Sequence, residues 1–286
     1  MRYTFFIPSD LMDIKLSVLI QKMLPALPEY AIREAFEKRD VKMNGARVSK
    51  EVRAAPGAEV LLYTRHRGTD IPIVYEDANL MLVRKPAGIS CEADGRGGKT
   101  VTQWAAEASC RKGIPEREPL LCHRLDNQTE GLLLLAKHEH AQAELMEAFR
   151  LHTIHKIYTC LVKGEPKPPR GMLRAYLLKD SRLGRVQVMQ QPIPGGRAIA
   201  TEYQVLEAGL VSRLEVRLHT GRTHQIRAQL AAIHHPILGD DIYGDRAFNR
   251  AHKARRLKLC ASALFFSLAG EMAYLNERFF SIDPMF

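Results

Sequence analysis

The sequence has no long run of apolar residues. Its longest runs, residues 132–136 and 261–269, fall well short of the roughly 18–20 residues that a membrane-spanning helix needs. The N-terminal segment has only three successive apolar residues before Pro8, and so lacks the apolar core of a secretory signal peptide. We therefore expect a protein that does not enter a membrane and stays in the cytoplasm.

Cysteine is also scarce. The 286 residues include five cysteines, widely spaced at Cys91, Cys110, Cys122, Cys160 and Cys260. Their odd number and scattered positions argue against a disulfide framework and predict free thiols in or near the core. Because the sequence contains no C-x-x-C and no H-E-x-x-H pattern, we expect no metal site.

Acidic residues are outnumbered. The sequence has 32 Asp and Glu against 42 Lys and Arg, a formal net charge of +10. This excess suggests a polyanionic partner such as a nucleic acid, although many basic proteins bind none. Hydrophobic residues at 46% and charged residues at 26% are ordinary for a folded protein, and the length permits one large domain with a small one.

Residues 1–63 have the pattern of a small separate domain of two helices and a hairpin. Helical spacing of apolar residues predicts one helix that ends at Pro25 and a second that begins at Pro28. A strand from Val41 runs into an Asn-Gly turn at residues 44–45, and a further strand covers residues 59–63. Basic residues around this turn, among them Lys42, Arg47 and Lys50, would make one edge positive.

The rest of the chain predicts a larger α+β domain. Residues 64–72 are polar and contain Gly and Pro, which is typical of a linker. In residues 73–286, β-rich stretches outnumber helical patterns and do not alternate regularly with them. We therefore expect a mixed, mostly antiparallel sheet.

One segment carries most of the information about function: His123-Arg-Leu-Asp-Asn-Gln-Thr-Glu-Gly-Leu-Leu. By composition alone it is a turn in which Asp126 hydrogen-bonds its own backbone. Its residue order, however, matches the H-R-L-D-x-x-T-x-G-L-L motif of pseudouridine synthases of the RluA, RluC and RluD type, which this chain resembles.

Other segments match that family in the same order. Residues 75–88 resemble its Y-E-D and K-P-x-G motif, and residues 156–164 its K-x-Y motif. Residues 218–227 and 235–244 resemble G-R-T-H-Q-I-R and H-P-x-x-G-D-x-x-Y-G. Residues 1–63 resemble the alpha-L RNA-binding domain, so the resemblance covers nearly the whole chain.

The resemblance implies an enzyme that isomerises uridine in RNA without a cofactor or a metal. Asp126 would be the essential carboxylate, as a nucleophile at the sugar or as the base that removes a ribose proton. Tyr158 would be the active-site tyrosine, and Arg227 would keep Asp126 ionised. Other residues implied to bind RNA are Arg124, Lys42, Arg47, Lys50 and Arg222. Structural support of the site is implied for Lys85, Pro86 and Leu259.

The helical pattern supports a special role for Arg227. Thr223 is a candidate N-cap, and Ile226, Leu230 and Ile233 form an apolar face, so Arg227 lies near the first helical turn. A cation there opposes the helix macrodipole, at a cost of roughly 0.3–1 kcal/mol. Sequences keep such unfavourable placements mostly at functional sites. The alternative is an arginine that extends into solvent.

The chain departs from the family pattern at Glu130, Gln229 and Cys260, which concerns substrate choice more than the reaction. Two other functions remain open: a non-catalytic RNA-binding or ribosome-assembly factor, and a hydrolase, which would need Glu130 as a second carboxylate. The substrate would be large-subunit ribosomal RNA or, alternatively, transfer RNA. We expect a monomer.

Overall fold

The structure, a computed structural model, divides the chain into two compact units. The first consists of Met1–Ile73 and Lys85–Pro119, and the second of Val74–Arg84 and Leu120–Phe286. Most of the predicted linker lies outside the described residues, as do Pro25 and Pro28. The structure describes residues 2–8, 11, 14–24, 27, 29–50, 52–64, 71–93, 99–110, 118–180, 184–276 and 278–286.

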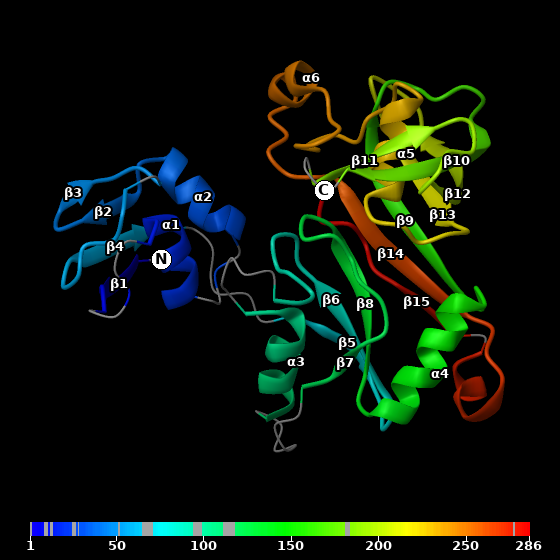
Figure 1. Ribbon diagram of the computed structural model, residues 1–286, viewed down its shortest axis with the longest axis horizontal. Coiled ribbons are helices and arrows are strands. Elements are labelled where there is room, and N and C mark those ends of the chain that lie inside the picture. Colours follow the sequence, from blue (N-terminus) through cyan, green and yellow to red (C-terminus); the bar gives the residue numbers. More distant parts are fainter. Residues whose placement is uncertain are drawn as a thin grey trace. The chain divides into compact units, whose positions relative to one another are not determined.

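The N-terminal part of the first unit packs two helices against a four-stranded sheet of order β1-β4-β2-β3 (Figure 1). Its buried core includes Leu16, Leu19 and Ile20 from one helix and Val60 from the sheet. The elements are β1 (Arg2–Phe6), α1 (Leu16–Met23), α2 (Glu29–Glu37), β2 (Val41–Met43), β3 (Ala46–Arg47) and β4 (Glu59–Tyr63), and α3 (Val101–Cys110) follows later in the unit. The helices and the strands at Val41 and Glu59 were predicted, whereas β1 was not.

The Asn-Gly turn forms as predicted. Asn44 and Gly45 both have positive φ, 49° and 80°, which suits an Asn-Gly pair between two strands. The Asn44 Oδ1 atom accepts a hydrogen bond of 2.9 Å from the Glu59 backbone N–H, which joins the turn to β4. In this hairpin Lys42 lies directly opposite Arg47. Like charges at opposite positions destabilise a hairpin, so the stability of the hairpin does not explain why both positions are basic.

The described part of the second unit contains an 11-stranded sheet of order β11-β10-β12-β13-β9-β14-β8-β6-β5, with β15 on β14 and β7 on β8. Strands β9 to β13 pair antiparallel, and β8 pairs parallel with β14. The predicted mixed, mostly antiparallel sheet is confirmed. The strands are β5 (Ile73–Glu76), β6 (Leu80–Lys85), β7 (Leu120–Leu121), β8 (Glu130–Ala136), β9 (Ile154–Lys163), β10 (Arg170–Asp180), β11 (Arg185–Met189), β12 (Arg197–Glu207), β13 (Val211–Leu218), β14 (Leu259–Phe266) and β15 (Phe279–Ser281).

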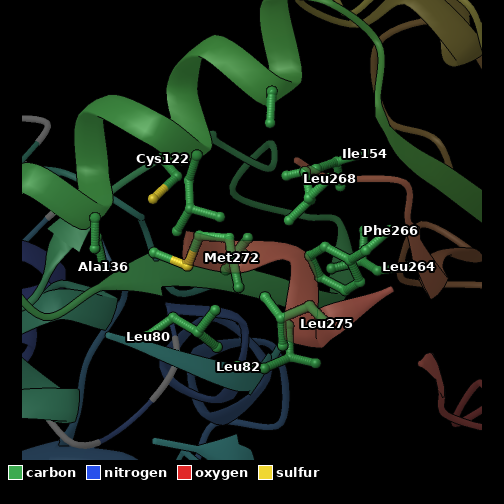
Figure 2. Packing of buried hydrophobic residues seen from close by; sticks show 14 of the residues in the cluster. Leu80, Leu82, Cys122, Ala136, Ile154, Leu264, Phe266, Leu268, Met272 and Leu275 are labelled. Carbon is green, nitrogen blue, oxygen red and sulfur yellow. The ribbon is translucent and has the colours of Figure 1, made fainter. Parts of the chain in front are cut away.

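The helical elements of this unit are α4 (Glu139–Arg150), α5 (Gln225–Ala232), α6 (Arg246–Ala251) and the 3-10 helix η1 (Gly270–Leu275). Helix α4 covers one end of the sheet, and Leu145 packs there with Leu82, Phe266 and Leu275 in the core shown in Figure 2. All seven residues of β8 are buried, which explains the continuous apolar sequence that follows Glu130 in this strand.

Helix α5 packs on the other part of the sheet through a smaller apolar cluster. Its Ala228 belongs to one cluster with Ala175 and Leu177 of β10, Val186 of β11 and Ile199 of β12, and Figure 1 shows α5 beside these strands. A small residue at this point lets the helix approach the sheet closely. This packing places the N-terminal turn of α5, with Arg227, at a defined position above the strands.

Strands β8 and β14 approach each other unusually closely at Gly131. Its φ is 126°, and a Cβ atom there would lie 2.4 Å from both the backbone N and O of Ala261. Only glycine fits this position, which accounts for the glycine of the T-x-G-L-L segment.

Four cysteines are free and buried: Cys91, Cys122, Cys160 and Cys260. The prediction of free thiols in the core is confirmed for these four. Across the described ranges, every helix is too short or too polar to cross a lipid bilayer.

Candidate active site

Asp126 lies in the loop between β7 and β8, and this loop is held at both ends. At the start, the buried ring of His123 accepts a hydrogen bond from the backbone N–H of Leu134 in β8, at 3.0 Å. At the end, the Thr129 N–H donates to the Asp126 carbonyl at 3.0 Å and closes a turn, as the composition predicted. Burial, followed by the nearby charge of Lys156, lowers the pKa of His123 to about 3, so the ring is neutral and can accept. The first residue of the motif therefore fixes the loop to β8.

The side chain of Asp126 approaches the start of α5. Its Oδ2 atom lies 3.5 Å from Nη1 of Arg227 and 3.8 Å from Nε2 of His224, both at the start of α5. The side chain of Asp126 is 23% exposed, whereas that of Arg227 is 3% exposed. The structure thus brings the predicted carboxylate and the predicted arginine together, with the carboxylate accessible and the cation buried.

Helix α5 begins one residue later than predicted. Its N-cap is His224, with φ 54°, and Thr223 lies outside the helix, so the predicted N-cap was wrong. The side chain of Gln225 takes the place of a Thr223 cap. Its Oε1 atom accepts hydrogen bonds from the Arg222 N–H and the Thr220 hydroxyl, and these bonds close the loop before the helix. Arg227 lies in the first turn, as expected.

The guanidinium of Arg227 is shared among three carboxylates. Its Nε and Nη2 atoms donate to Oδ2 and Oδ1 of Asp240 at 2.7 and 2.8 Å, a bidentate pair in which the Asp240 side chain is fully buried. Nη2 also donates to the exposed Asp241 at 3.2 Å, and Nη1 faces Asp126. Arg227 is therefore bound mainly to Asp240 and presents its remaining nitrogen to Asp126.

Both partners of the buried pair are charged. Burial alone would lower the pKa of Arg227, but the hydrogen bonds and charge of Asp240 outweigh it and raise the pKa above its ordinary value. Burial likewise would raise the pKa of Asp240, but Arg227 and the backbone N–H groups of Tyr243 and Ile242 hold it below its ordinary value. A fixed positive charge consequently lies beside Asp126.

Tyr158 lies in the middle of the sheet. In β9 it stands opposite Val216 of β13 and Ala261 of β14, and it is 6% exposed. Leu259, predicted to support the site, is buried two residues before Ala261 in β14 and pairs with Cys160. Tyr158 and Leu259 thus belong to neighbouring central strands.

The other predicted site residues are spread over both units. In the second unit, Arg124 and Arg222 are exposed, on the loops before β8 and α5. In the first unit, Lys85 is fully buried, and its Nζ atom donates to the Pro86 carbonyl at 3.1 Å. Also in the first unit, Arg47 and Lys50 are exposed and Lys42 is half-buried on the hairpin edge.

Two of the three departures from the family pattern face each other. Cys260 and Glu130 are partners in the parallel pairing of β14 and β8, and the Cys260 thiol donates a hydrogen bond to the Glu130 carboxylate. Burial, and then Glu130, raises the pKa of Cys260, so the thiol keeps its proton. Glu130 Oε1 also accepts from the Met285 N–H at 2.8 Å. Glu130 is thus engaged in holding the C-terminal segment.

Gln229, the third departure, ties α5 to the sheet. Its amide donates to the Leu173 carbonyl of β10 at 3.0 Å, and its Oε1 atom accepts from the Thr201 hydroxyl of β12 at 2.5 Å. All three departures therefore have structural partners in the second unit.

One group of side chains in the described ranges could hold a metal ion: His140, Glu144 and Glu271, whose ligand atoms lie within 4.8 Å of one another. His140 is four residues from Glu144 on α4, and their side chains form an exposed contact of 3.3 Å. Such exposed contacts on a helix surface commonly form without a metal.

Three residues of this site had not been singled out from the sequence: Asp240, His224 and Tyr243. Asp240 and Tyr243 belong to the H-P-x-x-G-D-x-x-Y-G segment and His224 to G-R-T-H-Q-I-R, so the motifs included them without indicating their role. Their pairing depends on the fold, because Asp240 and Tyr243 lie 13 or more residues after Arg227 and His224 in the chain.

Comparison with known proteins supplies the family context. Residues 79–232 match the model of the family described as RNA pseudouridylate synthase. An uncharacterized RNA pseudouridine synthase of Mycobacterium bovis is 34% identical over an alignment that covers 83% of this chain and 80% of the relative. The ribosomal large subunit pseudouridine synthase C of Vibrio vulnificus is 32% identical over an alignment that covers 91% of this chain and 87% of the relative.

A solved structure shares the fold. The human protein named RNA Pseudouridylate Synthase Domain Containing 1 superposes with a TM-score of 0.59 at 24% identity, over 71% of this chain and 82% of that chain.

Proposed function

The chain belongs to the RNA pseudouridylate synthase family, as its motifs predicted, and from this premise we propose that it isomerises uridines in large-subunit ribosomal RNA with Asp126 as the reacting carboxylate. The observation that carries the assignment of Asp126 is its geometry: an accessible carboxylate 3.5 Å from a buried guanidinium. The choice of ribosomal RNA rests on the name of the Vibrio relative, which matches this chain over most of its length.

The reaction breaks the bond between C1′ of ribose and N1 of uracil and forms a bond between C1′ and C5. The C5 proton leaves to water and N1 gains a proton from water. The nucleoside therefore keeps its composition, and no electrons are transferred. Asp126 acts at the sugar in its ionised form, as a nucleophile at C1′ or as the base that removes a ribose proton. Arg227 stabilises the ionised form in both cases by its nearby positive charge.

Other residues complete the proposed site. Tyr158, on β9, would stack on the uracil ring and assist the loss of the C5 proton, as the family resemblance implies. Arg124, two residues before Asp126, would occupy the space left when the target nucleotide is turned out of its stack. Lys85, Pro86 and Leu259 would have the supporting role that the family resemblance implies.

Residues 1–63 form the proposed RNA-binding domain, joined by residues 64–72 to a catalytic domain of residues 73–286. Opposite cations at Lys42 and Arg47 support this role, because the like-charge pair that destabilises the hairpin would be relieved by a phosphate between them. Arg222 on the loop before α5 would add a phosphate contact.

The proposal is tested with purified protein on separate large-subunit ribosomal and transfer RNA transcripts labelled with tritium at uridine C5. Isomerisation releases this tritium into water. We expect release from ribosomal RNA by the wild type and none by Asp126→Asn, which should still bind RNA because phosphate contacts supply most of the affinity. Release by the Asn variant would exclude Asp126 as the reacting carboxylate. Release from transfer RNA alone would identify transfer RNA, not ribosomal RNA, as the substrate.

A further inference from the structure

His224 has an unusual place in this site. It is the N-cap of α5 and has a left-handed backbone, with φ 54°, which is costly for a residue other than glycine. Its side chain does not cap the helix. It is instead directed to Tyr243 on one side and to Asp126 on the other, with Nε2 3.8 Å from Asp126 Oδ2. Strained backbone of this kind persists where the surrounding structure holds it in place.

The hydrogen bonds of Tyr243 determine which ring nitrogen of His224 carries the proton. The Tyr243 hydroxyl accepts a hydrogen bond of 2.8 Å from the backbone N–H of Val186 in β11. Its own proton is then available to Nδ1 of His224, 3.1 Å away, and we assign Nδ1 as the acceptor. A neutral imidazole that accepts at Nδ1 carries its proton on Nε2, the atom that faces Asp126.

The charges around the ring favour this neutral form. Burial lowers the pKa of His224, Asp126 opposes the shift, and Arg227 on the same helix adds to it. Asp240 and Asp241, from the segment after α5, act in the same direction as Asp126, yet the pKa remains below its ordinary value. At neutral pH the ring is therefore a hydrogen-bond donor at Nε2 without a charge of its own.

We propose that His224 is a positioning residue for Asp126: its Nε2–H, fixed by the Tyr243 hydroxyl, holds one oxygen of the carboxylate so that the other is presented to the ribose. Arg227 approaches the same Oδ2 atom, so two donors of the described residues converge on one side of the carboxylate. The contact of 3.8 Å is longer than a hydrogen bond and is expected to shorten when substrate fills the site. The inference deepens the proposed function and rests on the role given there to Asp126.

Asp240 connects both donors. Its Oδ1 atom accepts from Nη2 of Arg227 and from the backbone N–H of Tyr243, at 2.8 and 2.9 Å. One buried carboxylate thereby orients Arg227 directly and His224 through Tyr243. Arg227 and His224, which Asp240 orients in these two ways, both face the Oδ2 atom of Asp126.

Two substitutions of His224 separate positioning from a structural role. His224→Gln places an amide N–H near the position of Nε2 but loses the acceptor at Nδ1. His224→Asn keeps an acceptor near Nδ1 for Tyr243 and tolerates positive φ well, but does not reach Asp126. We expect single-turnover tritium release from ribosomal RNA labelled at uridine C5 to stay within about threefold of wild type for Gln and to fall about tenfold or more for Asn, with RNA affinity unchanged in both.

A structural role predicts the opposite order, since Asn suits the left-handed backbone better than Gln does. Equal rates for the two variants, or a faster Asn variant, would overturn the proposal. Wild type and Asp126→Asn run in the same assay: no release by the wild type, or release by Asp126→Asn, would mean that the proposed function has failed rather than this inference.

Tyr243→Phe supplies a second measurement. It removes the hydroxyl but keeps the ring over Arg227. We expect it to slow the wild type about fivefold or more and to have little effect in the His224→Gln background, where no acceptor at Nδ1 remains. Equal slowing in both backgrounds would show that Tyr243 does not act through His224. Because the pKa of His224 lies below its ordinary value, His224→Gln should also leave the dependence of the rate on pH unchanged between about pH 7 and about pH 8.

Discussion

Arg227 donates its two shortest side-chain hydrogen bonds to Asp240, at 2.7 and 2.8 Å, and faces Asp126 at 3.5 Å. The buried Asp240 compensates most of the arginine's charge and fixes its plane. A partly exposed carboxylate such as Asp126 could not hold a buried cation alone, because removing a charge from water costs several kcal/mol. Because Asp240 holds two nitrogens of Arg227, the guanidinium is fixed, and its third nitrogen, Nη1, can still act on Asp126.

Asp240→Asn should destabilise the fold strongly. It leaves the guanidinium of Arg227 buried without its main partner, which costs about 3–5 kcal/mol in comparable buried pairs. Asp241→Asn is the matched control, since Asp241 contacts the same Nη2 atom at 3.2 Å but is 59% exposed, and should cost less than about 1 kcal/mol. Urea unfolding of both variants measures the difference. Equal losses would mean that the bidentate pair contributes no more than the exposed one.

The same pair predicts a loss of stability in acid. The pKa of Asp240 is held below its ordinary value of 3.8 in the folded protein, so the folded state binds this proton less readily than the unfolded state. The resulting stabilisation is fully present above the unfolded pKa and is lost as the pH falls through the folded pKa. Between about pH 5 and about pH 3, wild type should therefore lose more unfolding free energy than Asp240→Asn. Parallel curves for the two proteins would contradict the depressed pKa.

Glu130→Gln should leave tritium release within about twofold of wild type, because Glu130 holds Met285 and Cys260 and has no part in the proposed chemistry. Gln keeps the carbonyl oxygen that accepts from Met285. Glu130→Ala removes this acceptor and should cost about 1 kcal/mol of stability. Urea unfolding measures the stability of both variants, and single-turnover assays measure their rates of tritium release. A large loss of rate with normal stability in Glu130→Gln would instead favour a second reacting carboxylate, as in a glycoside hydrolase.

Gly131→Ala should lower the free energy of unfolding by about 3 kcal/mol or more. The new Cβ atom would lie 2.4 Å from the Ala261 backbone, which the paired strands cannot move aside, and the backbone conformation is itself unfavourable for alanine. Gly270→Ala is the control, because it has positive φ but nothing within 4 Å, and should cost only about 1 kcal/mol. Thermal unfolding of both variants measures the effect of the close approach of β8 and β14, and equal losses for the two would contradict it.

Replacing Lys42, Arg47 and Lys50 by glutamine should weaken RNA binding and reduce its dependence on salt. If each contacts a phosphate, the slope of log affinity against log salt should become less steep by roughly 0.7–0.9 for each residue. The Lys42→Gln change alone should also stabilise the hairpin slightly, since it removes the charge opposite Arg47. Filter binding at several salt concentrations measures the slope. An unchanged slope would mean that these three side chains do not contact phosphates.

Local sequence patterns predicted much of the fold. The continuous apolar run of β8 and the Asn44-Gly45 turn each depend on residues a few positions apart. The β1 strand was missed because five residues at a sheet edge, alternately exposed and half-buried, carry little apolar pattern, and their main partner β4 lies some 55 residues later. Such pairing is not encoded in local periodicity.

The sequence by itself determined the family and the candidates Asp126, Tyr158 and Arg227, since the motifs that contain them are long and ordered along the chain. Only the tertiary structure decided how these side chains are held. It joined Asp240 to Arg227 directly and to His224 through Tyr243, placed His224 beside Asp126, and paired Glu130 with Cys260 across β8 and β14. The reason is physical: hydrogen bonds and ion pairs act over about 3–4 Å in space, and chain packing, not spacing in sequence, sets which groups come that close.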